Sequence, residues 1–259
     1  MMSTAMDAKP EITVVDDAAA LADTAARAIV EIAVAAVAAR RRFTVALAGG
    51  STPRATYARL AQPPLATRMP WPHTLVFFGD ERGVPSDHAD SNYRMAHETL
   101  LMRVPIPPDH VFRIPGESAD PEAVAADYAR TLAEVLGVRR GEVPRLDLVL
   151  LGLGVDGHTA SLFPGSPVLK ETFRTVAAVH AAAASIPQRF TLTYPILNAA
   201  ACVIYLVAGA EKAKVVKAAL GDRMRGVPAA MVQPTDGRVL WMLDRAAASL
   251  LPSTIKRTS

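Results

Sequence analysis

Two side chains that could move a proton, Asp156 and His158, stand two residues apart in a glycine-rich stretch. The stretch follows Leu148–Leu151, an unbroken apolar run typical of a strand buried on both faces of a parallel sheet. Gly157 and its neighbouring glycines allow the tight turns that a ligand-binding loop needs, and we expect Gly157 itself to contact the ligand. Because open α/β sheets bind their ligands at the carboxyl ends of the strands, we expect a reaction centre here. The alternative is that His158 only caps a helix or satisfies a loop.

The segment Gly152–Gly157 also matches, formally, the glycine fingerprint of dinucleotide-binding sites. That fingerprint needs a long helix after the glycines and an acidic residue at the end of the next strand. Pro164 and Pro167 shorten the following helix to about two turns, and Glu171 comes before the next apolar run. Nicotinamide binding is therefore not favoured, and we expect no cofactor.

A second glycine-containing stretch could hold a phosphate. Phe43–Ala48 reads as a buried strand. Four residues that could surround an anion follow it: Gly49, Gly50, Ser51 and Thr52. We expect one of the two hydroxyls to cap a helix from Pro53 to Ala61, whose free N–H groups and positive dipole end favour an anion. An ordinary capped helix would look the same, and the Lys of a nucleotide-binding P-loop is missing.

Charged residues also border other predicted strands. Three of them come directly after the apolar run Thr74–Phe78: Asp80, Glu81 and Arg82. A solvated turn is the alternative to a site at this edge of the sheet. Arg189 precedes the run Phe190–Thr193, and Lys212 follows the run Ala201–Val207. Each of these two cations is a candidate for the site or for the surface.

The scaffold that must position these residues alternates strands and helices. Apolar runs predict strands at residues 11–15, 43–48, 74–78, 148–151, 175–179, 190–193, 201–207 and 239–243, with a short one at 111–114. Helical spacing and caps predict helices from Asp16 or Asp17 to about Val37, and at about 53–61, 93–102, 121–136 and 210–220. This alternation predicts an α/β fold with a mostly parallel sheet and helices on both faces. We expect one domain over residues 11–250, a flexible segment at 1–10 and a polar tail at 251–259.

Composition excludes several classes of protein. The chain has 259 residues, 51% of them hydrophobic, and a formal net charge of +3. Its basic clusters fall at expected helix ends and in the tail, so we expect no nucleic-acid partner. The single cysteine, Cys202, allows no internal disulfide, and the six histidines lack metal-ligand spacing, so we expect no metal. The first ten residues lack the apolar core of a signal peptide. Polar residues and Pro195 divide Phe190–Ala210 into a strand, a turn and a second strand, so we expect no membrane span and a cytoplasmic protein.

Taken together, these stretches resemble 6-phosphogluconolactonases, in order and over nearly the whole chain. The matching motifs are Gly49–Pro53, Asp80–Arg82 with Val84–Pro85 and Ser91–Tyr93, Gly152–Gly165, Arg189–Thr193, Gly209–Lys212, and Trp241 with Asp244. The resemblance implies a Rossmann-like fold shared with glucosamine-6-phosphate deaminases and ribose-5-phosphate isomerases. It also implies metal-independent hydrolysis of 6-phospho-D-glucono-1,5-lactone in the pentose phosphate pathway. We expect a monomer or a homodimer.

Hydrolysis of a δ-lactone needs a positioned water, a base and stabilisation of the oxyanion. We expect neutral His158 to be the base, with Asp156 or an acid from Asp80–Glu81 holding its imidazole. Arg82 could stabilise the oxyanion or bind the sugar. The phosphate would lie at Gly49–Thr52, where Arg189 and Lys212 would neutralise its charge.

Two other functions remain open. Deaminases share the Asp-Gly-His core, but they typically continue with Ile-Ala-Phe-Asn-Glu-Pro, which supplies a second acid. Here the sequence after His158 is Thr-Ala-Ser-Leu-Phe-Pro, which supplies none. Sugar-phosphate sensor domains use the same fold without turnover. They carry a helix-turn-helix, for which the residues before the first strand are too few.

Overall fold

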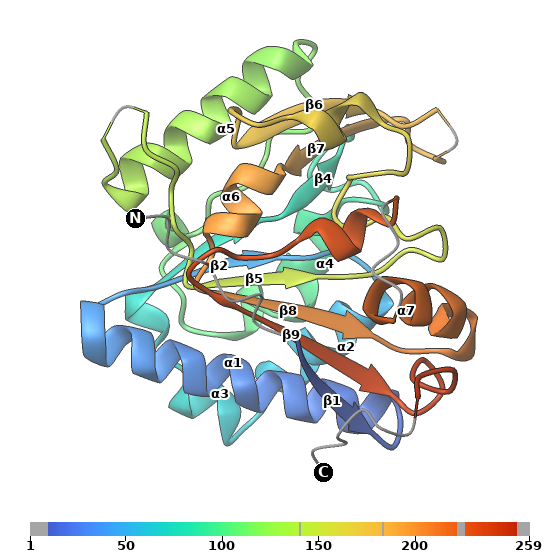
Figure 1. The fold of residues 1–259 in the computed structure, drawn as a ribbon. Coiled ribbons are helices and arrows are strands. Elements are labelled where there is room, and N and C mark those ends of the chain that lie inside the picture. The colour runs from blue at the N-terminus through green and yellow to red at the C-terminus, as the bar shows by residue number, and fades with distance from the viewer. Residues whose placement is uncertain (1–9, 140, 183, 222–225, 253–259) are drawn as a thin grey trace, which may run out of the picture.

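The protein is described by a computed structural model over residues 10–139, 141–182, 184–221 and 226–252. Within these residues, a six-stranded parallel sheet has the order β1-β9-β8-β5-β2-β3 (Figure 1). Its strands are β1 (Glu11–Val15), β2 (Phe43–Leu47), β3 (Thr74–Phe78), β5 (Leu148–Leu151), β8 (Cys202–Val207) and β9 (Arg238–Asp244). Every residue of β2, β5 and β8 is buried, as expected for apolar strands covered on both faces.

The helices of the described residues are α1 (Ala18–Arg40), α2 (Ser51–Leu60), α3 (Leu65–Arg68), α4 (Asn92–Thr99), α5 (Pro121–Leu136), α6 (Tyr194–Ala199) and α7 (Ala213–Leu220). In Figure 1, α1 and α3 lie on one side of the six-stranded sheet and α6 lies on the other. Asp17 caps α1 by accepting the N–H groups of Ala19 and Ala20. Asp120 caps α5, which ends at Gly137 with φ +68°. The predicted α/β class with a mostly parallel sheet is confirmed.

A second, antiparallel sheet differs from the prediction. It consists of β4 (Asp80–Arg82), β7 (Gln188–Leu192) and β6 (Val176–His180), in that order. We expected residues 175–179 and 190–193 to belong to the parallel sheet, and residues 80–82 to follow a strand rather than to form one. Only residues 181–187 separate β6 from β7, too few for the crossover that parallel neighbours need, so the two strands form a hairpin. In Figure 1 this sheet stands beside α5, apart from the larger sheet.

Three smaller expectations are also wrong. Residues 111–114 form no strand, and Val111 makes only a single bridge to Val76. The helix expected after Gly152–Gly157 is absent from the described residues, which removes the main requirement of a dinucleotide site. The stretch after residue 193, expected to be a turn, forms α6, where Pro195 lies in the first turn and needs no N–H partner.

Asp147 joins two central strands at the edge of the sheet where they begin. Its carboxylate is buried and accepts from the backbone N–H and the hydroxyl of Thr44, at 2.8 and 2.9 Å. Arg40 approaches the other oxygen at 2.5 Å. This buried carboxylate lies before β5, whereas the polar loops described below follow the strands. Among the described residues, no helix has the length and apolar character that crossing a bilayer would need.

Candidate active site

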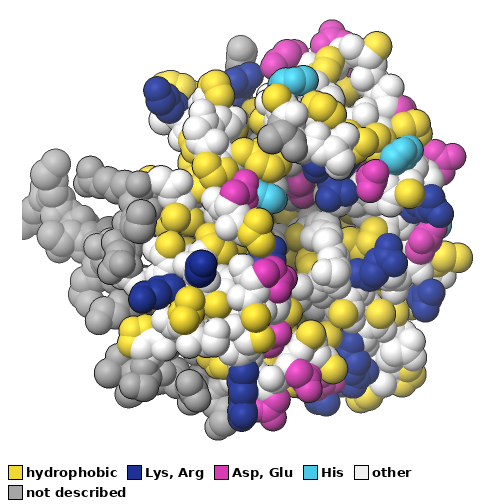
Figure 2. All heavy atoms as spheres, turned by 90° about the vertical axis from the view of Figure 1, so that its right-hand side faces the viewer, with side chains coloured by type: hydrophobic (Ala, Val, Ile, Leu, Met, Phe, Trp, Pro, Cys, Tyr) yellow, Lys and Arg dark blue, Asp and Glu magenta, His cyan; other side chains and the backbone are white. Residues whose placement is uncertain are grey.

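A cavity of about 300 Å³ opens at the carboxyl ends of the central strands, between the two sheets. Figure 2 looks onto this edge and shows a hollow with basic and histidine side chains near its rim. Nine residues predicted for the site line the cavity: Gly49, Gly50, Ser51, Thr52, Asp80, Arg82, His158, Arg189 and Lys212. Three others, Glu81, Asp156 and Gly157, do not line it. The structure thus gathers residues from five separate stretches of the chain.

Asp156 contacts His158 directly. Its Oδ1 accepts the backbone N–H of His158 at 3.1 Å and lies 2.6 Å from Nδ1 of the imidazole. Partial burial works to raise the pKa of Asp156, but its contacts with His158 outweigh this effect and hold the pKa below the ordinary value. A carboxylate at Nδ1 favours the tautomer with the proton on Nδ1, which leaves Nε2 free to accept a proton.

The loop around this pair depends on glycine. A Cβ on Gly154 would lie 2.1 Å from Nδ1 of His158, so only glycine leaves room for the imidazole. The ring of Phe163 packs against the imidazole at 4.6 Å between centroids. Gly157 was expected to bind substrate, but it has φ +88° and its carbonyl accepts the N–H of Ala229. Gly157 therefore shapes the turn and lies outside the cavity.

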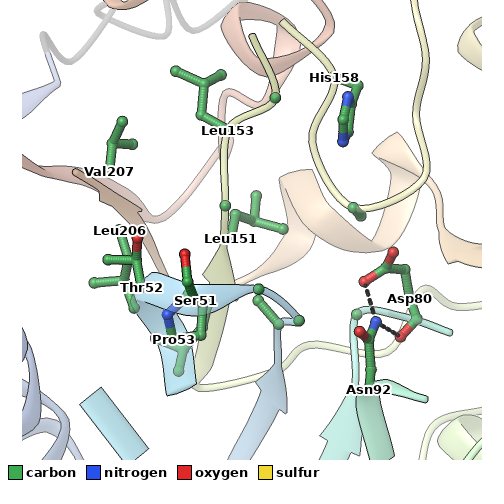
Figure 3. Close-up of a pocket in the computed structure, with 18 of the residues that line it drawn as sticks. Ser51, Thr52, Pro53, Asp80, Asn92, Leu151, Leu153, His158, Leu206 and Val207 are labelled. Carbon is green, nitrogen blue, oxygen red and sulfur yellow. Dashed lines mark hydrogen bonds between the residues drawn. The ribbon is translucent and has the colours of Figure 1, made fainter. Parts of the chain in front are cut away.

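The start of α2 forms the opposite wall. Contrary to expectation, Gly50 is the N-cap with φ +105° and makes no side-chain cap, and the helix begins at Ser51 rather than at Pro53. The hydroxyls of Ser51 and Thr52 are therefore not used for capping. In Figure 3, the Ser51 hydroxyl points away from α2 toward the open space that the His158 ring also faces. Free N–H groups, the helix dipole and two hydroxyls together suit a phosphate.

Tyr57 holds this loop in place. Its hydroxyl accepts the N–H of Ala48 and donates to the carbonyl of Ala48, both at 2.9 Å. The side chain is fully buried, and burial raises the pKa of Tyr57 above its ordinary value. The phenol therefore stays neutral and keeps both hydrogen bonds, which join α2 to the end of β2.

The carboxylate of Asp80 is held by two residues whose roles the sequence did not reveal. Asn92 Nδ2 donates to Oδ1 and to the carbonyl of Asp80, at 3.1 and 3.0 Å (Figure 3). The hydroxyl of Ser161 donates to Oδ2 at 2.9 Å. Asn92 also packs against Gly49–Thr52, the loop suited to a phosphate and named the phosphate loop below, because a Cβ on Gly49 would lie 1.9 Å from Oδ1 of Asn92. Both residues lie in motifs that resemble the family, Ser91–Tyr93 and Gly152–Gly165, but neither was among the residues predicted for the site.

Two arginines stand opposite each other on the antiparallel sheet. Arg82 on β4 is paired with Arg189 on β7. Arg189 Nε donates to the carbonyl of Ile186 at 2.7 Å, Arg82 donates to the carbonyl of Asp90, and Arg82 Nε is buried without a partner among the described residues. Burial, and then the charge of Arg82, lower the pKa of Arg189. Neither guanidinium forms an ion pair with a carboxylate of the described residues, and two adjacent cations of this kind favour the binding of an anion.

Lys212 belongs to a short 3₁₀ turn, Ala210–Lys212, after β8. The turn is held by the buried carboxylate of Asp244, which accepts the N–H of Gly209 with both oxygens, at 3.1 and 3.0 Å. Gly209 has φ +104°, and the carboxylate of Glu211 folds over it. Asp244 therefore anchors the segment that carries Lys212 at the cavity.

Glu81 was expected to be a catalytic acid that could hold the imidazole of His158, but it lies outside the cavity. Strand β4 alternates its side chains, so Asp80 and Arg82 face the cavity while Glu81 points to the other side. Glu81 is 2% exposed and accepts hydrogen bonds from the start of α4. Burial raises its pKa, although the backbone N–H groups around it act in the opposite direction. It does not contact the imidazole of His158, which leaves Asp156 as the acid beside that ring.

Within the described residues, no group of three or more His, Cys, Asp or Glu side chains could hold a metal ion. The cavity brings together the imidazole of His158, whose Nε2 can accept a proton, the fixed carboxylate of Asp80 and the cationic groups. This set suits a neutral base acting on an anionic substrate.

Comparison with known proteins agrees with this geometry. The family described as glucosamine-6-phosphate isomerases/6-phosphogluconolactonase matches residues 16–241. The 6-phosphogluconolactonase of Rattus norvegicus is 43% identical over 226 residues, or 85% of either chain. A probable chloroplastic 6-phosphogluconolactonase of Oryza sativa is 39% identical, over 90% of this chain and 73% of its own.

A solved structure, the 6-phosphogluconolactonase from Trypanosoma cruzi, superimposes with a TM-score of 0.85 at 35% identity, covering 95% of this chain and 98% of its own. The match therefore includes both sheets and the cavity between them, and the chain belongs to the glucosamine-6-phosphate isomerase and 6-phosphogluconolactonase family.

Proposed function

We propose that the protein hydrolyses 6-phospho-D-glucono-1,5-lactone to 6-phosphogluconate, in the pentose phosphate pathway. The observation that carries this proposal is the placement of the His158–Asp156 pair on one wall of a cavity whose other wall is the start of α2. The names of the relatives from Rattus norvegicus and Trypanosoma cruzi support the same reaction.

In the proposed mechanism, water attacks the lactone carbonyl while Nε2 of His158 takes its proton. Asp156 holds the imidazole in the required tautomer and favours the imidazolium that forms. The tetrahedral oxyanion then collapses, the bond to the ring oxygen breaks, and the imidazolium returns the proton to that oxygen. Arg82 places positive charge beside the oxyanion or a sugar oxygen, and Asp80 offers its fixed carboxylate to a hydroxyl group.

The phosphate of the substrate would bind at Gly49–Thr52. Backbone N–H groups at the start of α2 and the two hydroxyls would donate to its oxygens. Arg189 and Lys212 line the same cavity and would neutralise its charge. This arrangement fixes the far end of the substrate and leaves the lactone carbonyl for His158.

A deaminase reaction is less well supported by the residues around the imidazole. Ring opening and amine release need a further proton carrier, which deaminases supply from the segment after the histidine. Here the side chain from that segment that packs on the imidazole is Phe163, which carries no proton. A sensor without turnover would have no need of the Asp156–His158 contact. One assay separates the three: disappearance of the lactone, release of ammonia from glucosamine 6-phosphate, or neither.

Substitution of His158 by Ala tests the proposed base. We expect kcat to fall by about 10² to 10⁴, with little change in KM, because a general base acts in the transition state. His180 at the exposed end of β6 provides a matched control, and His180→Ala should keep both constants. An unchanged kcat in His158→Ala would remove this residue from the chemistry.

The compartment and the oligomeric state also belong to the proposal. We propose a cytoplasmic protein, a monomer or a homodimer. The relatives from Oryza sativa are named chloroplastic, so the compartment needs direct measurement by fractionation of the source cells. Light scattering of the purified protein gives the mass of the particle.

A further inference from the structure

Glu81 makes more hydrogen bonds than any role inside the cavity would explain. Its Oε1 accepts the N–H groups of Arg82 and Asn92 at 2.8 and 2.7 Å. Its Oε2 accepts the N–H of Tyr93 at 2.8 Å and the hydroxyl of Ser91 at 3.1 Å. One buried carboxylate thus joins β4 to the start of α4.

These bonds replace the partners that the first turn of a helix lacks. Asn92 and Tyr93 are the first residues of α4, and Glu81 accepts both of their N–H groups. Ser91 accepts the next N–H, from Arg94, at 3.1 Å, while its own hydroxyl donates to Glu81. The negative charge also lies at the positive end of the helix dipole. The start of α4 is therefore fixed to the back of the strand that carries Asp80 and Arg82.

Asn92 passes this constraint on to the cavity. Its side chain donates to the Asp80 carboxylate and packs against Gly49 in the loop before α2. If the start of α4 moved, the Asp80 carboxylate and the phosphate loop would lose the same support together. The pair of His158 and Asp156 lies on a different loop, after β5, and makes no hydrogen bond to Glu81 among those described.

We infer that Glu81 is a positioning residue for substrate binding, which acts through Asn92 on Asp80 and on the phosphate loop and does not touch the substrate. This inference rests on the proposed function for the identity of the substrate, but its structural content does not depend on turnover. It replaces the catalytic role that the sequence suggested for Glu81.

The test compares Glu81→Gln with Asp147→Asn. Both variants keep the size of a buried carboxylate that accepts several hydrogen bonds, but Asp147 lies before β5, at the edge of the six-stranded sheet that faces away from the cavity. In Glu81→Gln the amide NH₂ faces N–H donors, so α4 shifts. We expect KM for the lactone to rise about tenfold, with kcat within about threefold of wild type. Asp147→Asn should lower Tm and leave both kinetic constants unchanged.

Two other results would overturn the inference. A fall in kcat of about 10² at unchanged KM would make Glu81 a catalytic acid or the partner of His158. A lower Tm with both kinetic constants intact would make it a purely structural residue.

The variant Asn92→Ala tests whether Glu81 acts through the side chain of Asn92. If Glu81 acts through this side chain, Glu81→Gln should add little to KM in an Asn92→Ala background, whereas independent effects would multiply. Binding of inorganic phosphate, measured by calorimetry, should weaken by a similar factor in Glu81→Gln and not in Asp147→Asn. Because phosphate binding needs no turnover, it separates failure of this inference from failure of the proposed lactonase activity.

Discussion

The surroundings of Arg189 suit a role in binding rather than in chemistry. Its exposed fraction is 8%, burial and then the charge of the paired Arg82 lower its pKa, and its Nε–H donates to the carbonyl of Ile186. A guanidinium held in this way is ready for an anion, and its removal should cost binding energy without altering the attack on the carbonyl.

We therefore expect Arg189→Ala to raise KM about 10- to 100-fold, the range of a lost hydrogen bond to a charged group, with kcat nearly unchanged. Steady-state kinetics with the lactone measure both constants. Arg130, exposed on α5 and paired with Asp127, provides the control, because Arg130→Ala should alter neither constant. If Arg189→Ala kept the KM of wild type, the phosphate would have to lie elsewhere.

At this scale, residues with a strong local signal could be predicted and residues defined by distant contacts could not. His158 and Asp156 stand out because glycines surround them after an apolar strand. Asn92 and Ser161 are neutral and follow no spacing rule, yet they hold Asp80 from two directions. The sequence alone could not distinguish Glu81 from Asp80 and Arg82, because all three are consecutive charged residues. Their alternation along β4 is what directs Glu81 away from the cavity and the other two toward it.

Among the elements, the segment before β6 depends on one carboxylate. Glu171 Oε1 accepts three successive N–H groups, from Thr172, Phe173 and Arg174, and Arg174 Nε approaches Oε2 at 2.6 Å. The N–H of Phe173 first, and then Arg174, lower the pKa of Glu171 to about 2. The carboxylate therefore orders the turn that leads into the antiparallel sheet.

Folding lowers the pKa of Glu171, so the ionised carboxylate stabilises the folded protein fully at any pH above its ordinary pKa of 4.5. This contribution is lost as the pH falls toward about 2. We expect Glu171→Gln to reduce the free energy of unfolding by about 1 kcal/mol at pH 6, a value reduced for solvent screening. The difference between wild type and variant should shrink at pH 3. Urea unfolding of both proteins at pH 6 and pH 3 measures this difference. An equal difference at the two pH values would show that the ionised carboxylate of Glu171 is not its source.

The elements of the parallel sheet could be predicted because each strand is an apolar run that ends in glycine or a polar loop. The antiparallel sheet could not, since β4 consists of three charged residues and pairs with Thr191, Phe190 and Arg189 far along the chain. The hairpin of β6 and β7 could have been predicted from the sequence, because the connection between the two strands is too short for the crossover that parallel strands need.

For the molecule as a whole, the cavity joins elements that are distant in sequence, so a ligand should hold them together. We expect 6-phosphogluconate to raise Tm, since a ligand at 100 times its Kd adds about 2.7 kcal/mol to the folded state. Gluconate, which lacks the phosphate, should raise Tm much less. His158→Ala should keep the shift and Arg189→Ala should lose most of it. Equal shifts with both ligands would mean that the phosphate contributes nothing to binding.

The hydroxyl of Tyr57 closes the loop between β2 and α2 into a ring before any substrate arrives. The entropy of ordering this ring is lost once, when the chain folds, and not again at each turnover. A δ-lactone also hydrolyses without an enzyme, so the proposed enzyme accelerates the reaction usefully only if it binds the lactone quickly. Because the loop before α2 is ordered in advance, its ordering adds no step to binding, and encounter at this wall depends on diffusion and on charge attraction.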